Sequence, residues 1–255
     1  MMYDKQVEDK TAYFFEVYGA LPRASPGDDA STEKAFRMMN GVPEKPMILD
    51  IGCGPGKQTL ALARISGGRI IALDNHRPFL ERVEADARAL GLSARIKTVL
   101  QDMKTMDFAP GTFDVIWSEG ALYQMGFAAG LRACRPLLKA GGSIGLTELV
   151  WLTDDRSSEA VKWAWDYADM KDVKDNLALF EACGYEVDGH FTLPASSWID
   201  SYYGPMRARI RELRETCRDK AAAREVLDAA QAEIEGFEKC STELGYEFFV
   251  ARRTE

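Results

Sequence analysis

Histidine and paired cysteine are scarce in this chain, and their scarcity excludes whole classes of site. There are two histidines and five cysteines, and no two cysteines stand in a CxxC spacing. A structural zinc site needs clustered ligands and a disulfide framework needs paired cysteines, so we expect neither a bound metal nor disulfides. An odd, scattered set of cysteines is typical of reduced thiols in a cytoplasm.

Positive charge and long apolar runs are lacking too. The formal net charge is −8, and an acidic surface repels the phosphates of DNA and RNA. No apolar run reaches the roughly 18 residues that a membrane span needs, and the N-terminus has no apolar segment of the secretory kind. We therefore expect a cytoplasmic protein with no nucleic-acid or membrane partner.

Short apolar runs alternate with stretches of helical periodicity from about residue 47 onward. The expected strands cover residues 47–51, 69–74, 95–100, 113–118, 143–149, 185–193 and 246–251. Such alternation is typical of an α/β fold in which helices wrap a mostly parallel sheet. The sequence therefore predicts a doubly wound sheet of seven strands. The helix before the fifth strand contains Pro136, which should distort its last turn.

A glycine-rich turn joins the first strand to the first helix of this pattern. Residues 49–56 read LDIGCGPG, and glycines there let the backbone approach a ligand beside the free N–H groups of a helix N-terminus. The dinucleotide fingerprint GxGxxG needs a small third residue, but Lys57 stands at that place and glycine falls at Gly56. The spacing is GxGxG and disfavours a dehydrogenase.

Acidic residues follow the next two strands at the same edge of the sheet. Asp74 ends the second strand, where a carboxylate can accept hydrogen bonds from both hydroxyls of a ribose. Dinucleotide enzymes share this feature. Asp102 and Met103 follow the third strand, and the alternative for them is a turn-capping aspartate beside a core methionine. His76 should border the same ligand.

An acidic residue followed by GxGxG resembles motif I of the class I S-adenosylmethionine methyltransferases, and the resemblance extends over residues 47–149. It implies a sheet whose last strand is antiparallel, with S-adenosyl-L-methionine as cofactor and S-adenosylhomocysteine as product. The residues that it assigns to the cofactor are Asp50, Gly52, Cys53, Gly54, Gly56, Gln58, Thr59, Asp74, Asn75, Asp102, Met103 and Ser118. Of these, Asp50 and the glycine backbone belong to the methionine end, Asp74 to the ribose and Asp102 to the adenine. Ser118 would lie beside the transferable methyl.

The segment after the fourth strand points to a class of acceptor. Residues 116–123 read IWSEGALY and lack the Pro-Pro-aromatic motif that many nucleic-acid base methyltransferases carry there. Together with the loop at 23–27 and the segment at 191–198, they resemble a small-molecule subgroup related to the ubiquinone and menaquinone C-methylating enzymes. The resemblance implies a small-molecule acceptor.

Three side chains at the carboxyl edge of the sheet are candidates for catalysis, because ligands bind at that edge in open parallel sheets. Glu119 could act as a general base or anchor a cationic amine, or it could satisfy free N–H groups at a helix N-terminus. Tyr123 could orient the substrate through its hydroxyl or pack in the core. Glu148 ends the fifth strand and faces the same rim.

The chain is expected to form one domain over residues 1–255. Its parts are N-terminal helices at 1–45, a cofactor-binding core at 46–150, a cap and helix at 151–184, and the last two strands at 185–255 with a helical insert at 196–240. The parts outside the sheet either form a lid over the cofactor or thicken the domain. Trp151, Trp163, Trp165, Tyr202 and Tyr203 could supply an aromatic wall, although Trp163 and Trp165 cannot share one helix face.

The sequence thus predicts an enzyme that transfers a methyl group to a small molecule. Two alternatives stay open: a methyltransferase for a protein or RNA partner, and a non-catalytic module that binds a nucleotide cofactor. The residues leave open the acceptor atom and the oligomeric state, for which a dimer is possible.

Overall fold

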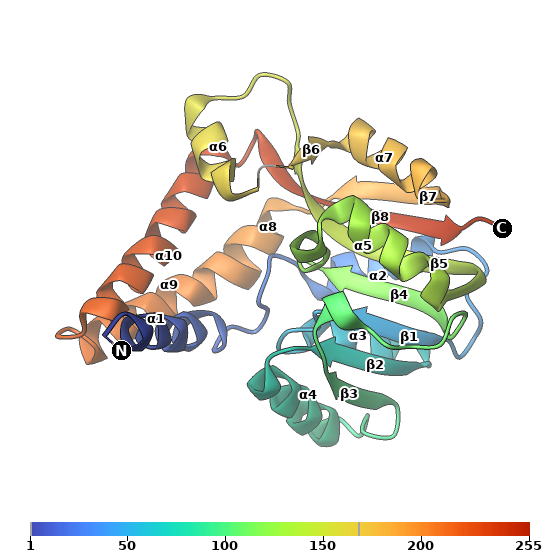
Figure 1. Ribbon diagram of the computed structural model, residues 1–255, viewed down its shortest axis with the longest axis horizontal. Coiled ribbons are helices and arrows are strands. Elements are labelled where there is room, and N and C mark those ends of the chain that lie inside the picture. Colours follow the sequence, from blue (N-terminus) through green and yellow to red (C-terminus); the bar gives the residue numbers. More distant parts are fainter. Residues whose placement is uncertain (1, 168) are drawn as a thin grey trace.

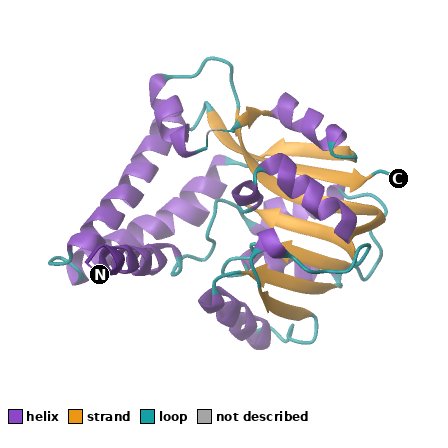
Figure 2. Ribbon diagram, viewed as in Figure 1, coloured by secondary structure: helices purple, strands orange, loops and turns teal. Residues whose placement is uncertain are grey.

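One sheet forms the centre of the protein, in the strand order β3-β2-β1-β4-β5-β8-β7 (Figures 1 and 2). The computed structural model describes residues 2–167 and 169–255, without the side chains of residues 2–8 and 166. The strands are β1 (Met47–Ile51), β2 (Arg69–Asp74), β3 (Ile96–Leu100), β4 (Phe113–Glu119), β5 (Leu138–Trp151), β7 (Tyr185–Thr192) and β8 (Leu244–Arg253). Strand β8 is antiparallel to both of its neighbours, and the pairings among β1 to β5 are parallel. The predicted sheet is confirmed. The two-residue strand β6 (Lys171–Asp172) pairs with the last two residues of β5, outside the main strand order.

Helices cover both faces of the sheet because successive strand side chains point to opposite sides. Helices α2 (Asp29–Met38), α3 (Lys57–Ser66) and α4 (Arg77–Ala89) lie on one face, and α5 (Phe127–Cys134) and α7 (Val173–Ala182) lie on the other. In β1, the side chain of Ile48 packs into the hydrophobic core on the face covered by α2, α3 and α4, and that of Leu49 packs into the core on the face covered by α5 and α7. Both side chains are fully buried. Such two-sided burial is typical of parallel strands.

Helix α5 ends before Pro136, which the sequence analysis placed inside the last turn of the helix. The helix stops at Cys134, and Arg135–Leu137 continue as a single 3-10 turn around Pro136. Proline has no N–H to donate and its ring crowds the preceding turn, which explains the change. The chain then enters β5 at Leu138.

The remaining helices gather beyond the carboxyl ends of the parallel strands, to the left in Figure 1. This helical cap consists of α1 (Met2–Tyr18), α6 (Ser158–Trp163), α8 (Ala195–Trp198), α9 (Gly204–Thr216) and α10 (Ala221–Cys240), with a π-helical turn at Ile199–Tyr203. Helix α1 packs against both α9 and α10. Among the described residues, no helix is long and apolar enough to cross a membrane. The cap thus faces the sheet edge at which the candidate residues lie.

Candidate functional site

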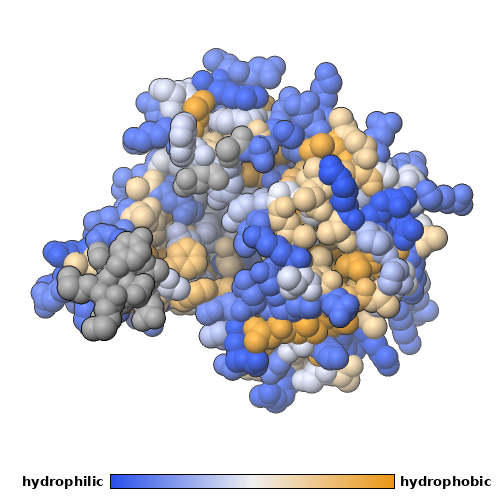
Figure 3. Space-filling view, viewed as in Figure 1, coloured by the Kyte–Doolittle hydropathy of each residue, from blue (hydrophilic) through white to orange (hydrophobic). Residues whose placement is uncertain are grey.

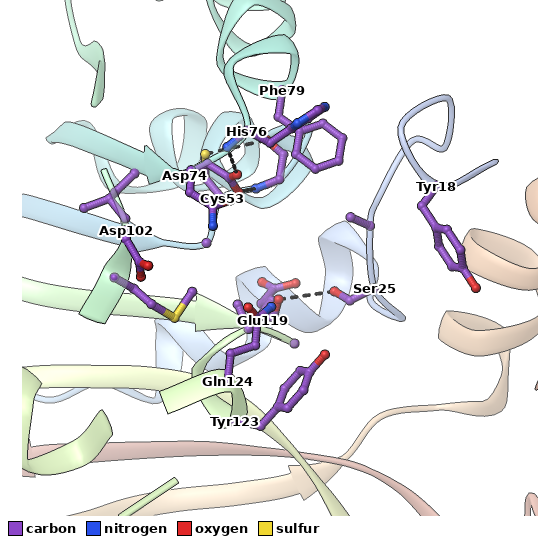
Figure 4. Close-up of a pocket in the computed structure, with 18 of the residues that line it drawn as sticks. Tyr18, Ser25, Cys53, Asp74, His76, Phe79, Asp102, Glu119, Tyr123 and Gln124 are labelled. Atoms are coloured by element: carbon purple, nitrogen blue, oxygen red, sulfur yellow. Dashed lines mark hydrogen bonds between the residues drawn. The ribbon is translucent and has the colours of Figure 1, made fainter. Parts of the chain in front are cut away.

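A cavity of about 420 Å³ opens at the carboxyl ends of the parallel strands. Its walls come from the turns that follow β1, β2, β3 and β4 and from helix α1 of the cap. Figure 3 shows the surface hollowed between the cap and the sheet. In Figure 4, Asp102 and Asp74 lie toward one end of the cavity, Glu119 lies in the middle, and Tyr18 lies at the far end.

The glycine turn after β1 forms the floor of this cavity. Gly52 and Gly54 have φ values of 66° and 53°, a region that side chains other than glycine rarely adopt. A Cβ on Gly52 would lie 2.4 Å from the Cβ of Ala121, so this position has no room for a side chain. The bare backbone of the turn is therefore exposed to whatever fills the cavity.

Asp74 at the end of β2 ties this turn to the next one. Its Oδ2 accepts a hydrogen bond of 2.9 Å from the backbone N–H of Gly54, and its Oδ1 accepts one of 2.8 Å from the N–H of His76. The carboxylate lines the cavity and is 9% exposed, and burial raises its pKa. Each oxygen retains a lone pair for a ligand hydroxyl.

Asp50 and Thr59 lie beneath the glycine turn, outside the cavity wall. The hydroxyl of Thr59 donates to Oδ2 of Asp50 at 2.5 Å. Oδ1 of Asp50 is buried, and no group in the described part of the chain donates to it. Burial raises the pKa of this carboxyl to about 7. Gln58, which precedes Thr59 on α3, donates a hydrogen bond of 2.8 Å to the carbonyl of Cys53 and so holds the turn from below.

Asp102 and Met103 line the same end of the cavity as Asp74. Oδ1 of Asp102 accepts a hydrogen bond of 2.8 Å from the N–H of Lys104 and caps a 3-10 turn at Met103–Thr105. Asp102 therefore caps a turn, as one interpretation of the sequence predicted. Because the residue also lines the cavity, its carboxylate stays available to a ligand.

Glu119 at the end of β4 has both carboxylate oxygens occupied by other side chains. Oε1 accepts hydrogen bonds from Thr32 at 2.7 Å and from Trp117 at 2.9 Å. Oε2 accepts one from Arg23 at 2.9 Å, and Arg23 also contacts Asp29. The side chains of Arg23 and Glu119 are 6% and 2% exposed. Glu119 thus caps no helix, and a cation of the chain itself occupies it.

Tyr123 reaches the rim of the cavity from the 3-10 turn Leu122–Met125 and is 39% exposed. Burial, with the nearby carboxylates Glu148 and Glu233, raises its pKa, so it carries its proton at neutral pH. Glu148 is not in the cavity wall. Its Oε2 is buried without a partner in the described residues, and burial raises its pKa to about 8.

Helix α1 supplies aromatic side chains to the site that the sequence did not single out. Phe15 of α1 stacks on His76 with ring centroids 3.7 Å apart, and Phe79 of α4 meets the same imidazole edge-on. Both phenylalanines line the cavity. In the sequence, only the aromatic residues that recur near the end of α1 indicate that this helix contributes to the site. His76 lines the same cavity, and its place beside the cofactor stays a prediction.

The cavity brings together most of the residues that the sequence analysis named. Its wall includes Gly52, Cys53, Gly54, Gln58, Asp74, Asn75, Asp102, Met103, Glu119 and Tyr123. Asp50, Gly56, Thr59 and Ser118 lie outside this wall. Ser118 donates to the carbonyl of Ile51 at 3.0 Å, and the α-carbon of Gly56 lies against Val83. Within the described residues, no cluster of histidine, cysteine or carboxylate side chains could hold a metal ion.

Residues 48–142 match the family model of the methyltransferase domain. A sterol 24-C-methyltransferase of Neurospora crassa is 24% identical over 208 residues, which cover 75% of this chain and 54% of that protein. The chain spans about half or less of the length of the curated relatives it matches.

Solved structures resemble the whole chain. A methyltransferase of Geobacter sulfurreducens in complex with S-adenosylhomocysteine has a TM-score of 0.82 at 20% identity, covering 95% of this chain and 98% of its own. One of Thiobacillus denitrificans, with the same ligand, has a TM-score of 0.81 at 23% identity, covering 94% and 97%. Residues 48–142 therefore resemble a methyltransferase domain, and the chain as a whole has the fold of S-adenosylmethionine-dependent methyltransferases.

Proposed function

We propose that this protein transfers a methyl group from S-adenosyl-L-methionine to a small-molecule acceptor and releases S-adenosylhomocysteine. The observation that carries the proposal is the continuous cavity that runs from Asp102 and Asp74 past the bare glycine turn to Tyr123. When bound, S-adenosylmethionine supplies a methyl group already activated by a sulfonium. The protein has to hold and orient the two reactants and exclude water.

The residues of the cavity suit the three parts of this cofactor. Asp74 offers a lone pair on each oxygen to a ribose, and Asp102 offers its carboxylate to an adenine amino group. The turn at Gly52–Gly54 leaves its backbone open where a side chain would collide. Beneath it, Asp50 is fully buried outside the cavity wall and accepts a hydrogen bond from Thr59, and its assignment to the methionine end stays a prediction.

Glu119 acts in this proposal as a positioning residue. Its ion pair with Arg23, and the hydrogen bond of 3.2 Å from the Ser25 hydroxyl to its backbone carbonyl, hold the loop at residues 23–27 against β4. Ala24 and Ser25 of that loop line the cavity. Its roles as general base or cation anchor, and the catalytic roles of Tyr123 and Glu148, stay predictions.

The experiment starts with binding. Calorimetric titration with S-adenosylhomocysteine should show a site that NAD does not fill. Incubation of the protein with methyl-labelled S-adenosylmethionine and a metabolite extract should then place label in products that survive nuclease and protease treatment. Binding of NAD without binding of S-adenosylhomocysteine would overturn the proposal. Label confined to digestible material would instead favour a protein or RNA acceptor, and binding without transfer would favour a non-catalytic module.

The finer expectations rest on the sequence alone. They are the kinship with the ubiquinone and menaquinone C-methylating subgroup, a dimer and a cytoplasmic location. The net charge of −8 supports an acceptor other than nucleic acid. The cap beyond the strand ends supports an enclosed, small acceptor.

A further inference from the structure

A second, smaller cavity of about 60 Å³ adjoins the first. The two share Ala24, Ser25, Gly120 and Tyr123 in their walls. By general scaling, this volume holds roughly four to six water-sized groups, which suits the head group of a small molecule. We call this space the aromatic chamber.

The chamber takes its name from the side chains that the cap and β8 contribute. Its wall includes Trp163, Tyr167, Trp198, Tyr202 and Tyr246. Trp163 and Tyr167 stack with centroids 5.9 Å apart, and Trp198 lies 5.0 Å from Tyr246. The surface that these residues present to the chamber is mostly polar rather than apolar. A polar wall that includes a carboxylate favours a positively charged group.

One carboxylate also lines the chamber, and no basic side chain of the described residues pairs with it. Glu233 on α10 accepts hydrogen bonds from the hydroxyls of Tyr18 at 2.8 Å and Tyr203 at 3.3 Å. The described residues that line the chamber include no lysine, arginine or histidine. Even a half-buried carboxylate without a counter-ion is costly, and burial raises the pKa of Glu233. A cationic ligand would supply the missing charge.

Tyr123 stands between the two cavities, and the nearby Glu233 carboxylate helps to raise its pKa. Glu148 on β5 lies outside the chamber wall. An anionic acceptor would meet repulsion from Glu233, and a neutral one would leave the Glu233 charge uncompensated. The local electrostatics favours a cation.

We propose that the aromatic chamber binds a small aliphatic ammonium group and that the methyl acceptor is therefore an amine. The inference rests on the proposed function. A protonated amine that gives its proton to the Glu233 carboxylate exposes the nitrogen lone pair that an acceptor needs. Because the nitrogen loses H⁺ and gains CH₃⁺, its charge is +1 before and after, and the chamber suits acceptor and product alike.

Choline and its uncharged carbon isostere, 3,3-dimethylbutan-1-ol, test the proposal by calorimetry on protein loaded with S-adenosylhomocysteine. We expect choline to bind at least 10-fold more tightly, because the two probes share shape and differ in charge. Equal affinity for the two probes, or no binding of choline, would overturn the proposal. This comparison uses the wild-type protein and needs no variant.

Variants then locate the site. Glu233→Gln should lower the affinity for choline at least 10-fold and leave that for the isostere and for S-adenosylhomocysteine unchanged. Glu235→Gln, on the same helix but exposed, is the matched control. Trp163→Leu, which keeps the charge and removes one ring, should also weaken choline more than the isostere, and it serves if Glu233→Gln does not fold.

The two proposals fail in different ways. If S-adenosylhomocysteine binds normally and choline does not depend on Glu233, the amine inference fails and methyl transfer to another acceptor stands. If S-adenosylhomocysteine does not bind to the wild-type protein, the proposed function itself fails.

Discussion

The guanidinium of Arg23 lies against the carboxylate of Glu119, with Nη1 2.9 Å from Oε2 and both side chains almost fully buried. The pair joins the loop before α2 to the end of β4, two segments 96 residues apart. Asp29 is the second partner of Arg23 and is exposed. Removal of the Glu119 charge would therefore leave a buried guanidinium with one solvent-screened partner.

Glu119→Gln should lower the free energy of unfolding by about 3 kcal/mol, the lower end of the cost of breaking a buried ion pair. Urea unfolding monitored by circular dichroism measures it. Glu33→Gln is the control, since Glu33 forms an exposed pair with Arg37 on α2 and should cost about 0.5 kcal/mol or less. Equal stability of the two variants would refute the structural role of the Arg23–Glu119 pair.

Asp74→Ala should weaken the binding of S-adenosylhomocysteine by about 1–3 kcal/mol, or roughly 5- to 150-fold in Kd. The reason is the loss of a charged acceptor that also holds the N–H of Gly54. Calorimetry measures the change. Asp107→Ala, an exposed residue away from the cavity wall, should bind as the wild type does. An unchanged affinity in Asp74→Ala would show that this carboxylate does not hold the ribose.

Glu148 should make the folded protein less stable as the pH rises. Its pKa is raised from 4.5 to about 8, so between these values the folded state binds more protons than the unfolded one. Stability then falls with rising pH, by up to about 1.4 kcal/mol per pH unit from this group. Asp50, with its pKa raised to about 7, contributes with the same sign.

Glu148→Gln removes this titration, so its unfolding free energy should fall less steeply from pH 5 to pH 8 and exceed that of the wild type at pH 9. Denaturant titrations across this range give both curves. Glu186→Gln, an exposed change on β7, should follow the wild type. Parallel curves for Glu148→Gln and the wild type would contradict the raised pKa.

Phe15→Ala should shorten the time for which S-adenosylhomocysteine stays bound. The ring stacks on His76 at the cavity wall, and such a contact contributes about 0.5–1.5 kcal/mol, or roughly 2- to 12-fold in the dissociation rate. The fold should persist because Arg82 holds the end of α1 through a hydrogen bond of 2.7 Å to the carbonyl of Leu21. Stopped-flow displacement measures the rate, with the exposed Leu90→Ala as control. Equal rates would rule out α1 as a cover of the site.

The sheet and the glycine turn could be predicted because their signals are local. Apolar runs, the GxGxG spacing and Pro136 each act within a few residues, and the structure shows the expected elements around them. The same holds for Trp163 and Trp165: two residues apart on a helix, they diverge, and Trp165 is 78% exposed while Trp163 lines the chamber.

The environment of each carboxylate could not be predicted, because it depends on partners distant in the chain. Glu119 was expected to act as a base, to anchor a cationic amine or to cap a helix, and nothing near it in sequence points to Arg23 or Thr32. Glu233 lies on a helix that carries charges of both signs, and such a pattern predicts a solvent-exposed helix face. Its hydrogen-bond partner Tyr18 is 215 residues away, and Glu233 lines the second cavity.

The position of β8 between β5 and β7 also has a consequence for how the chain is made. Residues 244–253 leave the ribosome after the whole helical cap, yet they fill an interior place in the sheet. Until β8 is made, the edge of β5 that will pair with it lacks most of its hydrogen-bond partners, and β7 has no partner strand. Such open strand edges template association between chains. Nascent protein should therefore depend on prompt synthesis of its last strand to avoid aggregation, and a ribosome stalled within α10 would present both edges to its neighbours.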